Sequence, residues 1–234
     1  LQNDTLFIDN ANYVDLNTIA ANEINDLTDG STEGFSNVFL GDSAGISVTD
    51  AAYNTGIGKN VLQNISSGAI NSNGYYTQSS FNTAIGYGSL QNTSTGLANT
   101  SIGYEALKKN VTGIYNVSVG AWSQLQSIST IGNTSVGFGS LQNNTQNYNA
   151  AFGYNSLNAN TTGYSNNAFG YGALAANTTG WGNTAFGSSL GSNTTGNNNV
   201  AFGYGTAQSS STSSNNTAIG AYALNSTGAQ NTAI

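Results

Sequence analysis

Asn82-Thr-Ala-Ile-Gly86-Tyr-Gly-Ser-Leu90 is one copy of a motif that recurs along most of this chain. The copies read Asn-Thr-Ala-(Ile/Phe/Val)-Gly, with variants, and their glycines lie 17 residues apart, occasionally 16. A fixed period of this length is typical of a solenoid, in which each repeat stacks on its neighbours. The repeat glycines of the main series are Gly86, Gly103, Gly120, Gly137, Gly153, Gly170, Gly187, Gly203 and Gly220, and earlier copies end at Gly41 and Gly58.

The residues within one copy predict how a coil is built. Thr-Ala-Ile-Gly-Tyr is a short extended stretch, in which Thr, Ile and Tyr point to one face and Ala and Gly to the other. A Leu four residues after the glycine supplies a second apolar anchor in a second short strand. The following Asn-Thr-Thr-Gly is turn chemistry, in which we expect Gly to supply a positive φ.

These assignments predict an all-β fold, a β-solenoid or β-roll with coils of about 17 residues. We expect Ile or Phe and Leu to fill the interior of each coil. The interior of such a coil is thin, so we expect the Ala/Gly face to pack against other copies of the chain. A parallel homotrimeric fibre is the arrangement that this interpretation favours.

Composition excludes several classes of function. Charged residues make up 6% of the 234 residues, and Cys, His, Met and Pro are absent. Without Cys and His we expect no zinc, haem or iron–sulfur site and no nucleophile–histidine catalysis. Three basic residues are too few for a phosphate-tracking nucleic-acid surface. We therefore predict no enzyme activity, no cofactor, no metal and no nucleic-acid partner.

Charge divides the chain into two parts. Nine of its ten acidic residues lie in the first 50 residues, and beyond residue 60 only Glu105, Lys108 and Lys109 are charged. We assign residues 1–36 to an acidic non-repeat segment with short strands, and residues 37–234 to the repeat body. The interval from Gly58 to Gly86 is longer than the period, which indicates an insertion at about residues 67–81.

The motif also resembles known repeats. Asn82 to Leu90 and Asn99 to Leu107 resemble repeats of phage and phage-like tail-fibre proteins, and Thr83-Ala-Ile-Gly86 is similar to the head repeats of trimeric autotransporter adhesins. Residues 5–16, Thr-Leu-Phe-Ile-Asp-Asn-Ala-Asn-Tyr-Val-Asp-Leu, look like a short hairpin that precedes such repeats. The resemblance implies a trimeric surface fibre outside the cell, on a virion tail or a cell surface.

Aromatic residues are the candidate ligand contacts. They often follow the repeat glycine, and stacked coils would align them either as a sugar-binding strip or as a ladder that holds coil to coil. We favour the ladder, because Lys59, Ala121, Ser188 and Ala221 interrupt the series. Trp122 and Trp181 lie off the consensus, and we expect them to fill irregular coils. The residues that could contact a ligand are Tyr75 and Tyr76 in the insertion and Tyr87, Tyr104, Tyr154, Tyr171 and Tyr204 in the series.

Repeated coils that carry no set of catalytic residues are suited to a rod that holds other parts of a protein at a distance. We therefore predict a structural and attachment fibre that spaces or presents receptor-binding parts. Its partners would be further copies of itself and a host-surface glycan or protein receptor, with no membrane insertion. A self-assembling extracellular filament and a carbohydrate- or ice-surface-binding solenoid are the alternatives. The ice-binding alternative depends on a Thr row that Val117, Ala150, Asn167 and Val200 interrupt.

Overall fold

The computed structural model describes residues 5–8, 12–15, 37–48, 51–66, 74, 77–208, 211–224 and 228–234. Within these ranges the secondary structure is all-β. Strands β1 (Thr5–Ile8) and β2 (Asn12–Asp15) pair antiparallel as a hairpin, with Thr5 opposite Asp15. The remaining strands form one parallel sheet of 12 strands.

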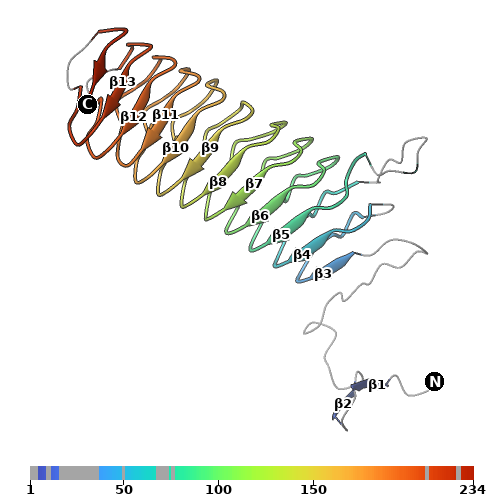
Figure 1. The fold of residues 1–234 in the computed structure, drawn as a ribbon. Coiled ribbons are helices and arrows are strands. Elements are labelled where there is room, and N and C mark those ends of the chain that lie inside the picture. The colour runs from blue at the N-terminus through green and yellow to red at the C-terminus, as the bar shows by residue number, and fades with distance from the viewer. Residues whose placement is uncertain are drawn as a thin grey trace.

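The parallel sheet is the side wall of a solenoid (Figure 1). Each strand pairs with the next strand along the chain, so every coil adds one strand to the stack. This arrangement confirms a β-solenoid of about 17-residue coils. The strands are β3 (Val38–Leu40), β4 (Thr55–Ile57), β5 (Thr83–Ile85), β6 (Thr100–Ile102), β7 (Val117–Val119), β8 (Thr134–Val136), β9 (Ala150–Phe152), β10 (Asn167–Phe169), β11 (Thr184–Phe186), β12 (Val200–Phe202), β13 (Thr217–Ile219) and β14 (Thr232–Ala233).

Each described coil contains one strand, so the expected second strand around the Leu is wrong. The nearest approach to a second ladder is a pair of isolated bridges that joins Leu97, Ile114 and Ile131. The Leu itself lies in a turn, with a φ of 47° in Leu107 and 51° in Leu174. This left-handed conformation, which non-glycine residues rarely adopt, aims the side chain into the coil.

The face of the strand that points into the coil is the one that we expected to point outward. In β10 the side chain of Ala168 is fully buried, whereas Asn167 and Phe169 point outward and are exposed or partly exposed. The alternation is therefore confirmed, but Ile or Phe does not fill the core and Ala does not face another chain. We call the outward apolar side chains the outer row: Leu40, Ile57, Ile85, Ile102, Val119, Val136, Phe152, Phe169, Phe186, Phe202 and Ile219.

The interior combines Leu with small side chains. The Leu row is confirmed as core, because its members have no exposed surface: Leu62, Leu90, Leu107, Leu141, Leu157, Leu174 and Leu190. Opposite the Leu, the strand contributes Ala or Ser, since the narrow coil leaves no room for a larger residue. Phe39 is the exception, and its ring occupies the space that Cβ atoms on Gly45 and Gly56 would need.

The repeat glycines bring successive coils close together. A Cβ on Gly170 would lie 2.6 Å from the carbonyl oxygen of Gly187, and the φ of Gly170 is +140°. The glycine that ends Asn-Thr-Thr-Gly differs from our expectation, because Gly163 and Gly180 do not have a positive φ. A larger residue does not fit at either position, because its Cβ would clash with the backbone of the next coil.

Buried asparagines form a second type of ladder. The first Asn of each coil from Asn37 to Asn216 is buried, and its Oδ1 accepts the backbone N–H of the corresponding Asn one coil further on. Asn149 accepts from Asn166, and Asn166 accepts from Asn183. The Nδ2 of Asn166 donates to Gly180 O at 2.8 Å. Buried polar groups must be paired to be tolerated, and this ladder pairs them along the rod.

A polar segment divides the apolar core into two clusters. One cluster ends at Leu107 and the other begins at Leu141. Between them Gln124 occupies the Leu position, and its Nε2 donates to Val117 O and Ser135 Oγ at 2.8 Å each. Its buried Oε1 has no hydrogen-bond partner among the described residues, so this coil is less favourably packed than its neighbours.

Restoring the consensus at this point should stabilise the rod. We expect the triple variant Ser123→Ala/Gln124→Leu/Ser135→Ala to raise the free energy of unfolding by about 1–3 kcal/mol, because it replaces a buried, partly satisfied group of polar side chains with apolar ones. Chemical denaturation followed by circular dichroism measures the change. A loss of stability would show that the polar segment is itself stabilising.

Candidate functional site

Aromatic rings stack along one long edge of the rod. Tyr87 and Tyr104 lie 5.4 Å apart between ring centroids with an interplanar angle of 12°, and Phe138 and Tyr154 lie 5.3 Å apart at 8°. Tyr171 continues the stack from Tyr154 at 5.4 Å. These rings form a ladder from coil to coil, and we call them, with Trp122 and Tyr204, the aromatic row.

Trp122 fills one of the interruptions that the sequence shows. Ala121 occupies the usual aromatic position, but the ring of the next residue lies 6.0 Å from Tyr104 and 5.2 Å from Phe138. Tyr222 follows Ala221 in the same way and contacts Tyr204 at 5.6 Å. An aromatic residue directly after an Ala is the signal that could have identified both substitutions.

Stacking limits what most of the aromatic row can bind. Tyr154 lies between Phe138 and Tyr171 with interplanar angles of 8° and 6°, so both of its faces are covered. A sugar ring binds an aromatic side chain through its face, whereas a stacked ladder presents edges to solvent. Among the candidate tyrosines, Tyr87, Tyr104, Tyr154, Tyr171 and Tyr204 are all exposed, by 43% to 70%.

The other aromatic candidates lie elsewhere. Tyr75 and Tyr76 are outside the described residues. Trp181 stacks on Tyr164 with a centroid distance of 5.6 Å and an interplanar angle of 4°, so it belongs to a separate ladder.

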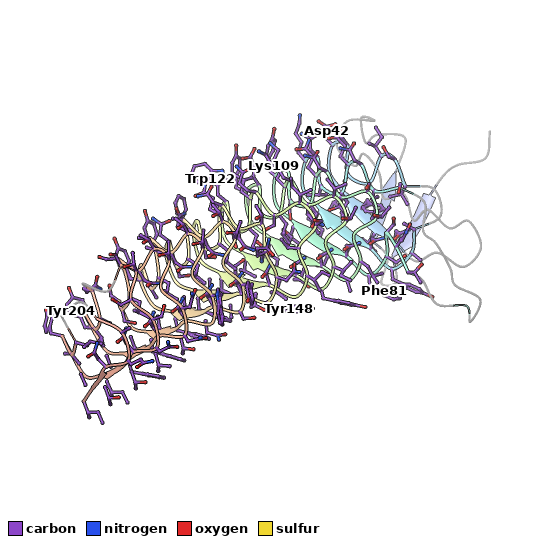
Figure 2. All side chains as sticks on the ribbon, turned by 90° about the horizontal axis from the view of Figure 1, so that it is seen from above. Asp42, Phe81, Lys109, Trp122, Tyr148 and Tyr204 are labelled. Atoms are coloured by element: carbon purple, nitrogen blue, oxygen red, sulfur yellow. The ribbon has the colours of Figure 1, made fainter. Side chains whose placement is uncertain are left out.

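Figure 2 shows Asp42, Lys109 and Trp122 along one long edge of the rod and Phe81 and Tyr148 along the opposite edge.

Most charged side chains of the described solenoid are paired. Lys59 contacts Asp42 at 2.7 Å, and this hydrogen bond lowers the pKa of the Asp42 carboxyl. Lys108 contacts Glu105 at 2.6 Å, and the hydrogen bond to Glu105 raises the pKa of Lys108. Lys109 donates a hydrogen bond to Gln126 Oε1 at 2.7 Å.

The carboxylates of the described solenoid are too far apart to act together. Asp42 follows β3 and Glu105 follows β6. Three strand spacings separate them by roughly 14 Å along the rod, whereas paired-carboxylate glycoside hydrolysis needs about 5–9.5 Å. Within the described ranges, no three metal-ligating side chains gather into a group, and no helix there has the length and apolarity to cross a membrane.

The outer face of the sheet is the second candidate surface. Ile102, Phe186 and Ile219 are 37%, 38% and 44% exposed. The phenyl rings of Phe169 and Phe186 stack at 4.6 Å, and those of Phe186 and Phe202 at 4.7 Å. The outer row is therefore a continuous apolar strip along the sheet.

Comparisons with known proteins do not assign this chain to a family. No protein family, curated protein or solved structure matches it. The class that its geometry defines is a parallel β-solenoid with one three-residue strand in most coils.

Proposed function

We propose that this chain is a structural and attachment fibre segment, a rod that spaces or presents receptor-binding parts at a host or other surface. It works as a parallel homotrimer outside the cell, on a virion tail or a cell surface. The observation that carries this proposal is the outer row, an apolar strip that follows the 12-stranded sheet along the rod. A long rod with such a strip is suited to assembly and reach.

The outer face favours another copy of the chain as its partner. None of the strands β3 to β14 contains a charged residue. Large exposed apolar patches on soluble proteins mark interaction sites, and a parallel copy presents the same row at the same spacing between coils. Three copies around one axis cover all three strips in a closed symmetric assembly. The copies therefore meet through the outer row, in place of the Ala/Gly face.

Charges placed in the outer row should separate the copies. We expect the double variant Phe169→Asp/Phe202→Asp to be monomeric, because each Asp would be desolvated at the interface without a partner. Light scattering coupled to size-exclusion chromatography measures the mass. The unmodified chain should have three times its own mass of 23.9 kDa.

Tyr171→Asp/Tyr204→Asp is the matched control. These residues lie two positions after Phe169 and Phe202 in the same coils but belong to the aromatic row. The control should remain trimeric, and circular dichroism should show β structure in both variants. A stable monomer of the unmodified chain contradicts the homotrimer, whereas long multimers in electron micrographs favour the self-assembling filament.

An ice-surface binder is a second candidate, favoured by one observation. Thr83 and Thr100 point outward beside Ile85 and Ile102, and β5 and β6 pair them in register on a regular sheet. Regular rows of this kind provide the flat array that ice binding needs. Thermal hysteresis in a solution of the protein would support this function, and its absence would remove it.

A further inference from the structure

The indole ring of Trp122 is turned steeply relative to the stacked rings of the aromatic row. Its interplanar angle is 78° with Tyr104 and 67° with Phe138, whereas stacked pairs in the row differ by 12° or less. Because Tyr104 stacks on Tyr87, its plane lies across the row, so the indole plane runs along the row. The faces of the indole therefore point sideways from the ladder, and the side chain is 36% exposed.

Hydrogen bonds and an ion pair surround the indole. Its Nε1 donates to Glu105 Oε2 at 3.2 Å, and Lys108 donates to the other oxygen, Oε1, at 2.6 Å. The Glu105 side chain is only 18% exposed, so these contacts fix it beside the indole. Lys109 and Gln126 pair on the same part of the rod.

The location of these charges is unusual for this chain. Beyond residue 60 the sequence has three charged residues, and two of them, Glu105 and Lys108, are joined to Trp122 by a chain of hydrogen bonds. The third, Lys109, follows Lys108 directly and bonds to Gln126. The other exposed side chains of the described body beyond residue 60 are uncharged. An exposed aromatic face, a carboxylate acceptor and an ammonium donor thus occur together at one place.

We propose that Trp122, Glu105 and Lys108 form a subsite for one hexose ring of a surface oligosaccharide. The indole face packs against the C–H face of the sugar, as aromatic side chains do at amphipathic ligands. The Glu105 carboxylate accepts hydrogen bonds from sugar hydroxyls, and Lys108 donates to sugar oxygens. This inference deepens the proposed attachment function and rests on it, because it names the ligand class.

Tyr222 supplies a control that matches Trp122. It also follows an Ala, and its ring makes an angle of 86° with Tyr204. It is 61% exposed, and no charged residue lies near it in the sequence. An aromatic ring turned in the same way is thus present without a charged acceptor or donor nearby in the sequence. Comparison of the two positions therefore distinguishes a specific subsite from non-specific binding to an exposed aromatic ring.

A printed array of neutral and acidic hexose oligosaccharides tests the subsite. We expect the unmodified protein to bind a subset of glycans, Trp122→Ala to lose at least about tenfold in affinity, and Tyr222→Ala to bind as the unmodified protein does. Trp122→Phe keeps a ring at this position and should retain part of the binding. Glu105→Gln should weaken binding several-fold, because an amide presents one acceptor oxygen instead of two.

Three outcomes overturn the inference: no glycan bound by the unmodified protein, equal binding by Trp122→Ala, or an equal loss in Tyr222→Ala. Circular dichroism of each variant shows that it is folded. The oligomeric mass is measured on the same samples. A trimer that binds no glycan contradicts the subsite and leaves the fibre proposal in place. A monomer that binds glycan contradicts the trimeric fibre and leaves the subsite in place.

Discussion

Gly170→Ala is expected to lower the free energy of unfolding by more than about 4 kcal/mol, because it combines a forbidden backbone conformation with a steric clash. The φ of Gly170 is +140°, in a region that L-residues with a Cβ avoid. The new Cβ would lie 2.6 Å from the carbonyl oxygen and 2.7 Å from the carbonyl carbon of Gly187. Relief of this clash requires the two coils to separate, which breaks β-ladder hydrogen bonds on both sides.

Gly172→Ala is the control in the same coil. Gly172 also has a positive φ, +59°, but a Cβ there meets only Ala175 Cβ at 4.0 Å. Other coils place Asn155 or Glu105 at this position with φ values of 52° and 54°, so a side chain is accommodated. Urea denaturation should show a loss of about 1–2 kcal/mol, the cost of the left-handed region for a residue with a Cβ, which is well below the loss expected for Gly170→Ala. Equal losses in the two variants would mean that Gly170 is required for its φ alone.

The alternation of the strand could be predicted from the sequence, but its direction could not. A period of two defines two faces and does not say which face is inside. Hydrophobicity favours Ile85 or Phe169 over Ala168 as core, and the structure reverses this order. The reason is the width of the coil, since Leu and the buried asparagines already fill a cross-section made by 17 residues.

Side-chain size carries the signal that hydrophobicity misses. The inward strand position holds Ala, Ser or Gly in every coil except at Phe39, where Gly45 and Gly56 provide the space. The neighbouring outward position accepts Leu, Ile, Val and Phe. Strict smallness indicates a confined interior position, and tolerance of several sizes indicates an open surface.

The candidate site could be predicted only in part. The ladder of aromatic rings follows directly from the period, because stacked coils place equivalent residues one above another. The orientation of Trp122 does not, since it depends on its one-residue displacement and on the hydrogen bond to Glu105 in the preceding coil. The repeat therefore predicts the features that all coils share, whereas the geometry at a departure from the repeat is seen only in the structure.

The burial of the asparagines and their hydrogen bonds also could not be predicted from the sequence. Turn chemistry accounts for an Asn at the end of a loop, but Asn166 is fully buried and lies in the middle of a ladder. Its Oδ1 accepts from Asn183 N at 3.0 Å and Asn183 Nδ2 at 3.1 Å. Its Nδ2 donates to Gly180 O at 2.8 Å and Asn149 Oδ1 at 3.2 Å. Both ends of the amide are therefore used.

Asn166→Asp tests this use of both ends with almost no change in shape. At pH 7 we expect a loss of about 3–5 kcal/mol, because a buried carboxylate would face two acceptors, Gly180 O and Asn149 Oδ1, without a donor. Burial and these acceptors disfavour the charged form, so the folded-state pKa of the new Asp is raised above its unfolded value of about 3.9. The protonated form can donate one hydrogen bond to Gly180 O.

The sign of the pH dependence follows from this raised pKa. The variant should regain stability relative to the unmodified protein as the pH falls through the folded-state pKa, and the gain should be complete below about 3.9. Asn215→Asp, at an exposed residue just before β13 and outside the sheet, should change little at either pH. Denaturation of both variants and the unmodified protein from pH 7 to 3.5 measures the difference. An Asn166→Asp penalty that does not shrink in acid would contradict the assigned donor role of Nδ2.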